Sequence, residues 1–521
     1  MINPITKRAQ IFLILLCFFL ATGIVLPALR LLETLLSADL TQALSPYNQS
    51  ALSNTLTIGL AVSICSTILG FIVAYTISST KAWGRSLLRV LFLAPIFAPS
   101  IMPAIGLIYL VGSNGLIFHS NLYGVTGVFL GALIFSIPHA TLQALIALES
   151  LDQRLLDAAR SLKAGGLKRL FTVVLSHCKN GLLNALLVTF VLTVTDFGIP
   201  KLLAGSFPML ATEIYAQAVE QQNFGIASFM SVWLLMPSLV AFYFIGKLKN
   251  ENFVQTVAVS SVRPAIFRDC LMTALAWAIV GFELASILIV IYGSFITFWP
   301  YVPTLSLVNY SFENSTYGVR PWINSLIIAL LVATIGTILS FAGAYIVNRV
   351  SRLPNLLKNS YSFLASLPIC IPGTVLGLGF LFTFNDCEIF NSAVGSIALI
   401  VFNTFIHLFT VAHLTAKNTL SYINPRYELV GKSLGISVSK TIYRVVIPLS
   451  TSGLKEIFCF LFASTLTTIS AVVFLYTPDS IVAAVAAIQM IDTGYVSEGA
   501  AMCTLIFASG LFVRILTLKL K

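Results

Sequence analysis

The sequence predicts an all-α, polytopic membrane protein with about twelve transmembrane helices, arranged as two similar six-helix halves. Three observations predict this class. The chain of 521 residues is 58% hydrophobic and only 9% charged, whereas about 25% of the residues of a soluble domain are charged. Its mean hydropathy is +0.95, and apolar runs long enough to cross a bilayer recur from end to end. Several patterns of the first half also return in the second half.

The apolar runs place the expected spans. They lie near residues 11–29, 53–78, 87–112, 123–148, 180–203, 226–246, 270–297, 322–347, 358–384, 393–415, 452–476 and 496–516. The first run follows Lys7 and Arg8 and could be read as a signal peptide. Its apolar stretch exceeds the roughly 7–15 residues of such a peptide, so we expect a retained helix.

Positive residues predict the orientation of the chain. With the N-terminus inside, nearly all of the 30 Lys and Arg residues fall on the inner side, and only Arg30, Lys201 and Arg320 fall outside. Cytoplasmic loops carry such an excess of positive charge. We therefore expect both termini to be cytoplasmic, and we attribute the net charge of +11 to the membrane and not to nucleic acid.

An internal repeat divides the chain. The SNTL pattern at 53–56 returns as INSL at 323–326, and PIFAP at 95–99 returns as PICIP at 368–372. The prolines are expected to kink two equivalent helices, because proline lacks a backbone N–H. Halves with even span counts insert with the same orientation, related by an axis along the membrane normal. The expected domains are a first half at 1–246, a cytoplasmic linker at 247–269 and a second half at 270–521.

A basic segment between hydrophobic helices occurs twice, near 149–176 and near 417–448. The two copies align at an offset of about 272 residues, which pairs Ser161-Leu162 with Ser433-Leu434. We expect a short helix on the inner surface that ends in a glycine turn, where the chain doubles back. Its small residues would let the surface of a partner protein approach closely; they are Ala158, Ala159 and Gly431.

These segments resemble the EAA loop of binding-protein-dependent ABC importer permeases, whose pattern is Glu-Ala-Ala, a Gly four residues later and an Ile-x-Leu-Pro ending. For the triad and the glycine, the first copy has Asp157, Ala158, Ala159 and Lys163. The second copy has Glu428 followed by Leu429, Val430 and Gly431 at the triad, and it keeps Gly435 and Pro448. The run Gly431-Lys432-Ser433 is not read as a phosphate-binding loop, because Arg426 stands where that motif needs its first glycine.

The resemblance implies a type I ABC importer fold and a transport subunit in the bacterial inner membrane. Each loop would dock on one of two copies of a cytoplasmic ATPase subunit that binds ATP and Mg²⁺. An extracytoplasmic binding protein would deliver the solute. The chain itself is expected to have no catalytic residue, to bind no cofactor or metal, and to be no enzyme.

Two stretches suggest a cargo. Residues 195–201 with 210–215, and residues 466–479, are similar to putative 2-aminoethylphosphonate permeases. The wider group of fused permeases also contains iron(III) and thiamine importers. The resemblance therefore implies a small solute, with 2-aminoethylphosphonate as the first expectation and iron(III) or thiamine as alternatives.

Polar residues at the ends of the expected spans could line the translocation path. The candidates are Asp196, Thr195, Thr467, Thr468 and Ser470. A carboxylate at membrane depth costs about 2.5–3.5 kcal/mol unless it faces a cavity or a partner. Alternatively, Asp196 caps a helix end or pairs with Lys201, and the hydroxyls bond helix to helix. Glu283, deeper in its span, is expected to make a peripheral structural pair, with a role in transport as the alternative.

Two other function classes remain as alternatives. An ion-driven secondary transporter with twelve spans would leave the duplicated loops unexplained. A membrane enzyme would need a cluster of catalytic acids or metal ligands, whereas the five His residues are scattered and the eight Cys residues lack metal-ligand spacing.

Overall fold

A computed structural model describes residues 4–248, 265–350, 353–385 and 396–519. Within these residues, nine helices are long and apolar enough to cross a membrane. Three further pairs of helices, each bent at a short break, bring the number to twelve if each pair is one span. The predicted all-α class with about twelve spans is confirmed. Of the expected linker, residues 249–264 lie outside the described residues.

The helices of the first half range in length from 4 to 34 residues. In chain order they are α1 (Pro4–Leu35), α2 (Leu40–Ala43), α3 (Pro46–Ser79), α4 (Arg85–Leu91), η1 (Ala94–Phe97), α5 (Ile101–Val111), α6 (Val125–Glu149), α7 (Gln153–Ser161), α8 (Gly166–Arg169), η2 (Leu170–Val174), α9 (Leu175–Thr195), α10 (Gly198–Leu203), α11 (Leu210–Tyr215), η3 (Ala216–Glu220) and α12 (Phe224–Lys247).

The second half repeats most of this order. Its elements are α13 (Ile266–Ser294), β1 (Ile296–Phe298), β2 (Val302–Leu305), η4 (Val308–Tyr310), α14 (Arg320–Arg349), α15 (Asn355–Ser366), η5 (Leu367–Cys370), α16 (Gly373–Asn385), α17 (Ile397–Ser421), α18 (Arg426–Ser433), α19 (Val438–Thr441), η6 (Ile442–Val446), α20 (Ile447–Leu449), α21 (Thr451–Thr467), α22 (Ala483–Asp492) and α23 (Val496–Lys519).

A small hairpin interrupts the all-helical pattern between α13 and α14. Its strands are antiparallel, and Ile296 lies opposite Leu305. The side-chain amide of Asn309 donates hydrogen bonds to the carbonyl oxygens of Ser294 (3.0 Å) and Ile296 (2.6 Å). The sequence analysis did not predict these strands, which are too short to leave a periodic pattern.

The two expected proline kinks are confirmed. The segments Arg85–Phe97 and Ile101–Val111 meet at 105°, and Asn355–Cys370 and Gly373–Asn385 meet at 111°. One proline of each repeated pattern lies in the break itself, where it supplies no N–H to continue a helix.

Two expected spans end earlier than predicted. The spans near 180–203 and 452–476 were expected to be continuous, but α9 ends at Thr195 and α21 ends at Thr467. The next residues, Asp196 and Thr468, have extended backbones with ψ of 137° and 128°. Apolar composition alone concealed these turns, because the residues beyond them are as hydrophobic as the helices.

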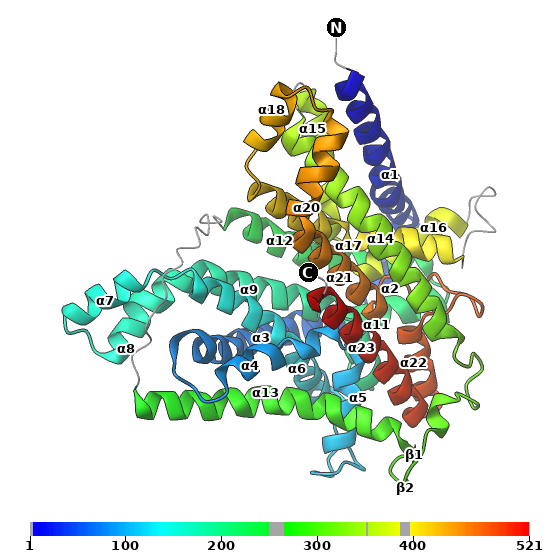
Figure 1. The fold of residues 1–521 in the computed structure, drawn as a ribbon. Coiled ribbons are helices and arrows are strands. Elements are labelled where there is room, and N and C mark those ends of the chain that lie inside the picture. The colour runs from blue at the N-terminus through cyan, green and yellow to red at the C-terminus, as the bar shows by residue number, and fades with distance from the viewer. Residues whose placement is uncertain (1–3, 249–264, 351–352, 386–395, 520–521) are drawn as a thin grey trace.

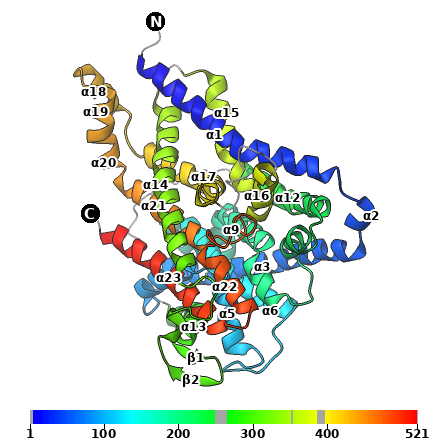
Figure 2. The ribbon, with the colours of Figure 1, turned by 90° about the vertical axis from the view of Figure 1, so that its right-hand side faces the viewer.

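The halves exchange their first helices. Within each half, three long helices pack together, α3 with α6 and α9, and α14 with α17 and α21. Helix α1, however, packs against α15 and α16 of the second half, and α13 packs against α4, η1 and α5 of the first. Figure 1 shows α13 lying beneath the helices of the first half, and Figure 2 shows α1 beside α15 and α16.

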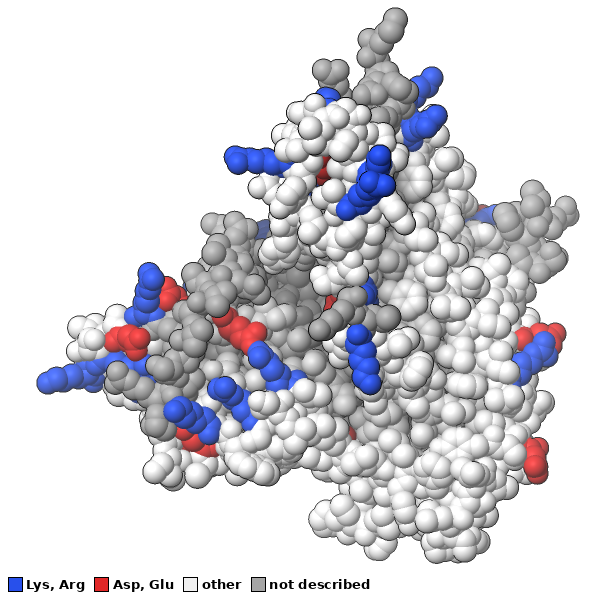
Figure 3. Space-filling model, in the orientation of Figure 1, with Lys and Arg blue, Asp and Glu red and all other residues white. Residues whose placement is uncertain are grey.

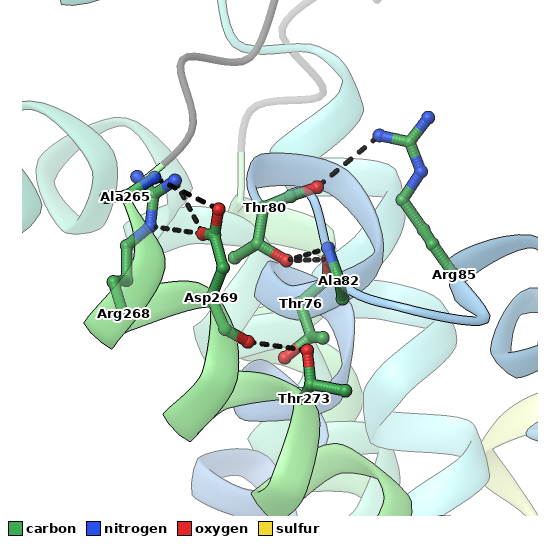
Figure 4. Close-up of polar contacts among 8 residues, drawn as sticks. All are labelled: Thr76, Thr80, Ala82, Arg85, Ala265, Arg268, Asp269 and Thr273. Carbon is green, nitrogen blue, oxygen red and sulfur yellow. Dashed lines mark hydrogen bonds and ion pairs between the residues drawn. The ribbon is translucent and has the colours of Figure 1, made fainter.

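Polar residues at the start of α13 lie beside those at the end of α3 (Figure 4). The largely buried Asp269 carboxylate accepts hydrogen bonds from the Ala265 N–H (3.1 Å) and from Nε of Arg268 (2.9 Å). Across the interface, the Thr76 hydroxyl donates to the carbonyl oxygen of Met272 (3.2 Å). The exchanged helix is therefore anchored by specific polar contacts as well as by apolar packing.

Farther along α13, its backbone approaches α5 too closely for any side chain at Gly106. A Cβ added there would lie 2.0 Å from the carbonyl oxygen of Ser286. Close backbone contact at small residues is how membrane helices commonly pack, because lipid gives them little hydrophobic drive to associate.

Replacing Gly106 by Ala should therefore destabilise the protein by about 3 kcal/mol, because the backbone of one helix has to move away from the other. Thermal unfolding in detergent micelles would show a lower melting temperature. Gly281→Ala is the matched control, since a Cβ at this α13 position meets no atom within 4 Å. An equal effect of the two substitutions would contradict the close contact between α5 and α13.

Candidate coupling loops and translocation path

The two basic segments fold in the same way. In each, a short helix (α7 or α18) is followed by a one-turn helix (α8 or α19) and by a π-helical turn, η2 at 170–174 and η6 at 442–446. The two π-helical turns are 272 residues apart, which is the offset between the two copies of the segment in the sequence. The segments lie far apart at the edge of the molecule, α7 at the left and α18 at the top of Figure 1.

The turn that ends each short helix is left-handed. Lys163 has a φ of 55° and Gly435 a φ of 69°. Beyond each turn, a backbone N–H reaches back five residues, from Ala164 to the oxygen of Ala159 (3.0 Å) and from Ile436 to that of Gly431 (2.9 Å). This is the Schellman pattern of helix termination. The predicted glycine turn thus forms in both copies, although a lysine takes the left-handed position in the first.

Exposed apolar side chains occur at equivalent places of the two loops. Leu162 is 83% exposed and its counterpart Leu434 is 70% exposed. Two further pairs of exposed side chains match at the same offset; they are Leu155 with Tyr427 and Phe171 with Tyr443. Sequence reasoning missed these pairs, although their constant offset was a readable signal.

The residues of the predicted triads have different surroundings. Asp157 is exposed, and its carboxylate lies 2.7 Å from the Arg160 guanidinium. Ala158 is exposed and Ala159 half-buried. In the second loop, Leu429, Val430 and Pro448 are exposed.

Gly431 was expected to let a partner protein approach closely, but its position differs from that expectation. It is buried inside the loop, and a Cβ there would lie 2.7 Å from the hydroxyl oxygen of Thr441. Its missing side chain lets α18 contact α19.

A buried arginine ties the second loop to the membrane helices. Arg349, at the end of α14, has a side chain only 7% exposed, and its Nε lies 3.8 Å from Oε1 of Glu428. It also donates hydrogen bonds to the carbonyl oxygens of Leu420 (2.6 Å) and Ile423 at the end of α17. The repeat places Ser79 and Leu156 at the corresponding positions of the first half, so that loop has no such clamp.

Partial burial raises the pKa of the Glu428 carboxyl above its ordinary value, whereas the charge of Arg349 and a hydrogen bond from Tyr345 act in the opposite direction. Both partners come from α14. This contact was not predicted, because no local pattern joins residues about 80 positions apart.

The exits of the two loops also differ. Residues Gly166–Thr195 form one span, whereas Val438–Leu449 and Thr451–Thr467 meet at 73°. Pro448 lies in the second exit and Ser176 in the first. The missing N–H of the proline accounts for this difference.

Asp196 caps the short helix that follows it. Its carboxylate accepts a hydrogen bond from the Ile199 N–H (2.8 Å) at the start of α10. Lys201 is not its partner, since the Lys201 ammonium lies 3.8 Å from Glu220 and 3.9 Å from Asp492. The structure therefore agrees with local capping, but not with the expected ion pair.

Three of the candidate path hydroxyls bond to their own helices. Thr195 donates to the oxygen of Val191 (2.9 Å), Thr467 to that of Ala463 (3.1 Å) and Thr468 to that of Ser464 (2.8 Å). Ser470 lies against the start of α16, where a Cβ on Gly373 would be 2.4 Å from its Oγ. These donors are occupied, although each hydroxyl oxygen can still accept a hydrogen bond.

The structure brings the two candidate path segments together. A Cβ on Gly198 of the first half would lie 3.2 Å from Cδ1 of Ile469 in the second, and 2.6 Å from Oγ of Ser100. The amide of Asn403 holds the second segment by donating to the oxygen of Ala471 (2.7 Å). The turns after α9 and α21 therefore meet where the halves meet.

Glu283 does not form the expected structural pair. It is 1% exposed, and neither carboxylate oxygen has a hydrogen-bond partner among the described residues.

One of the scattered histidines has a tyrosine partner. Nδ1 of His413 lies 3.1 Å from the hydroxyl oxygen of Tyr361. In the described part of the chain, no group of three or more His, Cys, Asp or Glu side chains could hold a metal ion.

Substituting the residue in each left-handed turn should change the local stability of that loop. Gly435→Ala should cost about 1–2 kcal/mol and Lys163→Gly should gain about 1 kcal/mol, because only glycine adopts this conformation without steric cost. Hydrogen exchange of the loop amides would measure both changes. Gly166→Ala is the control, since its Cβ meets no atom within 4 Å and its φ is not positive. Equal protection in all variants would contradict the strain argument.

Replacing Arg349 by Met should loosen only the second loop. The substitution leaves two carbonyl oxygens without their donor and removes the cation beside the Glu428 carboxylate, at a cost of about 2–3 kcal/mol. Hydrogen exchange should become faster in residues 420–434, while residues 153–163 serve as the control within the same molecule. Faster exchange in both loops, or in neither, would refute the clamp.

Comparison with known proteins agrees with this architecture. Residues 66–250 match the family described as "Binding-protein-dependent transport system inner membrane component". The chain is 27% identical to the ferric transport system permease protein FbpB of Actinobacillus pleuropneumoniae, over 86% of this chain and 68% of the relative. It is also 27% identical to a putative ferric transport system permease protein FbpB of Haemophilus influenzae, over 83% of this chain and 71% of that protein.

A shorter relative matches less than half of this chain. The spermidine/putrescine transport system permease protein PotB of Haemophilus influenzae is 26% identical, and 80% of its length corresponds to only 41% of this chain. About two-fifths of this chain thus corresponds to most of that relative. With the duplicated loops and the matching helix order of the halves, these similarities support the expected class, an inner-membrane permease of the binding-protein-dependent ABC importer type with two halves fused in one polypeptide.

Proposed function

We propose that this chain forms the transmembrane path of an ATP-driven importer and that α7 and α18 each receive one copy of a cytoplasmic ATPase subunit. The observation that carries the proposal is the duplicated loop. Two segments far apart in the chain share the same helices, the same left-handed turn and matching exposed apolar side chains. A repeated surface of this kind suits a partner that is present in two copies.

The chemistry of the loops supports protein docking. Burying a leucine side chain at an interface contributes about 1.5–3 kcal/mol, and Leu162 and Leu434 are among the more exposed leucines of the chain. Each loop also carries Lys and Arg residues around its apolar side chains. An apolar centre with a charged rim is typical of a specific interface.

The distribution of charge supports a cytoplasmic position for both loops and both termini. Figure 3 shows Lys and Arg side chains gathered over the regions of α7 and α18, whereas the lower part of this face, around β1 and β2, is almost free of charge. Positive residues concentrate on the cytoplasmic side of membrane proteins. The expected domains, with halves on either side of a linker at 247–269, fit this orientation.

Motion at a loop has a direct route into the membrane. Each loop continues through a π-helical turn toward α9 or α21. These helices end just before Asp196 and Thr468, where the two candidate path segments meet. Closure of an ATPase pair on ATP and Mg²⁺ would favour one arrangement of these helices, since ATP binds that closed state more tightly. The solute would be delivered from the other side by a binding protein.

Iron(III) is the cargo best supported by the comparisons. Two relatives that each match more than four-fifths of the chain are named as ferric transport permeases. A third relative with such coverage is named only as a probable ABC transporter permease. The resemblance of residues 195–201 and 466–479 to 2-aminoethylphosphonate permeases keeps that solute as the second candidate. Thiamine has no support beyond membership of the same group.

Uptake measurements test both levels of the proposal. Cells without the gene should take up less radiolabelled iron(III), with 2-aminoethylphosphonate and thiamine measured in parallel. The wild-type gene should restore uptake, whereas Leu162→Asp with Leu434→Asp should abolish it, because a carboxylate cannot enter an apolar contact without a large desolvation cost. Leu167→Ser is the control, since its counterpart in the second loop is already Ser439.

The outcomes are distinct. Loss of 2-aminoethylphosphonate or thiamine uptake alone would change the cargo and keep the mechanism. Full uptake by the double loop variant would contradict ATPase docking and favour a secondary transporter.

A further inference from the structure

The two halves also meet through charged residues beyond the ends of α9 and α21. These helices run from the loops to Thr195 and Thr467, so the residues that follow are separated from the loops by a helix of about 30 Å. Here the first half contributes α10 and η3, and the second contributes α22. This junction is not explained by the docking of an ATPase at the loops.

One lysine lies between two carboxylates at this junction. The ammonium of Lys201 is 3.8 Å from Oε1 of Glu220, in its own half, and 3.9 Å from Oδ2 of Asp492, in the other half. The same ammonium lies 5.5 Å from the ring centroid of Tyr215, within the range of a cation–π interaction. The contact therefore joins the halves.

The two carboxylates are equivalent positions of the repeat. Glu220 ends η3 and Asp492 ends α22, and their numbers differ by 272, as do those of η2 and η6. The residue that corresponds to Lys201 is Val473. A single cation thus serves two acidic residues that the repeat brings to the same junction. Without it, their like charges would repel each other.

Aromatic contacts surround the cation and also cross between the halves. The ring of Tyr215 lies 5.9 Å from that of Phe474 in the second half and 5.3 Å from that of Phe197 in its own half. On the second half, the Gln489 amide donates to the hydroxyl of Tyr476 (2.7 Å). The ion contact is therefore part of a closed, ordered junction.

We propose that Lys201 holds the two halves together at the end opposite the coupling loops and that its separation from Asp492 accompanies opening of the path at this end. This inference deepens the proposed function and rests on it, since it assigns a residue to one of the two closures that alternating access requires. The proposal follows from the geometry of three residues and does not depend on the cargo.

The strength of the contact suits a reversible closure. All three side chains are partly exposed, Lys201 by 28%, Asp492 by 46% and Glu220 by 57%. Ion pairs with such exposure contribute little individually, because water screens them. Lys201 would bias the junction toward closure without locking it, and the two carboxylates would favour separation once the cation has left.

A distance measurement on the purified full chain tests the proposal without an ATPase or a cargo. Spin labels are attached at Gln221→Cys and Thr493→Cys, the exposed residues that follow the two carboxylates, in a background without the native cysteines. Wild type should give one narrow distance distribution by double electron–electron resonance. Lys201→Met should shift it to longer distances, and Lys201→Asp should shift it further, because three carboxylates then share one site.

A charge exchange separates the proposed contact from general damage. Lys201→Asp combined with Asp492→Lys again places one cation between two carboxylates and should restore the narrow distribution. Asp479→Asn is the matched control, because it breaks an exposed ion pair with Arg320 that lies within one half, and it should leave the distances unchanged. Restored distances would support the proposal even if uptake assays failed to confirm iron(III) as the cargo.

Unchanged distances in Lys201→Met and Lys201→Asp would overturn the proposal. So would a charge-exchanged variant that stays as open as Lys201→Asp alone. Loss of uptake in Lys201→Met with wild-type distances would place Lys201 in the passage of cargo, and it would also overturn a role in closure.

Discussion

The constraint on which the rest of this structure depends is that backbone groups cannot remain unpaired in the hydrocarbon region of a membrane. Two of the candidate spans are broken at a proline, at angles of 105° and 111°. Each break is covered by protein, because α13 packs along α4, η1 and α5, and α1 packs along α15 and α16. The exchange of first helices is thus what allows the proline breaks, and it also binds the halves into one body.

The broken helices in turn place the turns that follow α9 and α21. The segment after Thr195 packs on the start of α5, where Ser100 lies against Gly198, and the segment after Thr467 packs on the start of α16, where Ser470 lies against Gly373. Both turns follow the ends of α9 and α21 that lie farthest from the loops. Covered breaks, path turns and coupling loops therefore form one connected arrangement in each half.

The halves are similar but not equivalent in their chemistry. The second loop is held by Arg349 through Glu428 and two carbonyl oxygens, and its exit is bent by a proline. The first loop has neither feature and places a lysine in the left-handed turn. At the opposite end, the single ammonium of Lys201 serves a carboxylate from each half. Fusion of the halves in one chain permits such differences, because each copy of a repeat can change independently.

The sequence by itself determined the class, a span count of about twelve, the repeat, the proline kinks and the duplicated loops, because these depend on composition, local spacing and residues with special backbone preferences. Gly435, for example, marked a left-handed turn that also forms at Lys163. Only the tertiary structure decided which helices pack together, where α9 and α21 end, and which charges meet. Arg349 with Glu428, and Lys201 with Asp492, are pairs of residues about 80 and 290 positions apart. Such contacts arise from three-dimensional packing and leave no periodic signal in the chain.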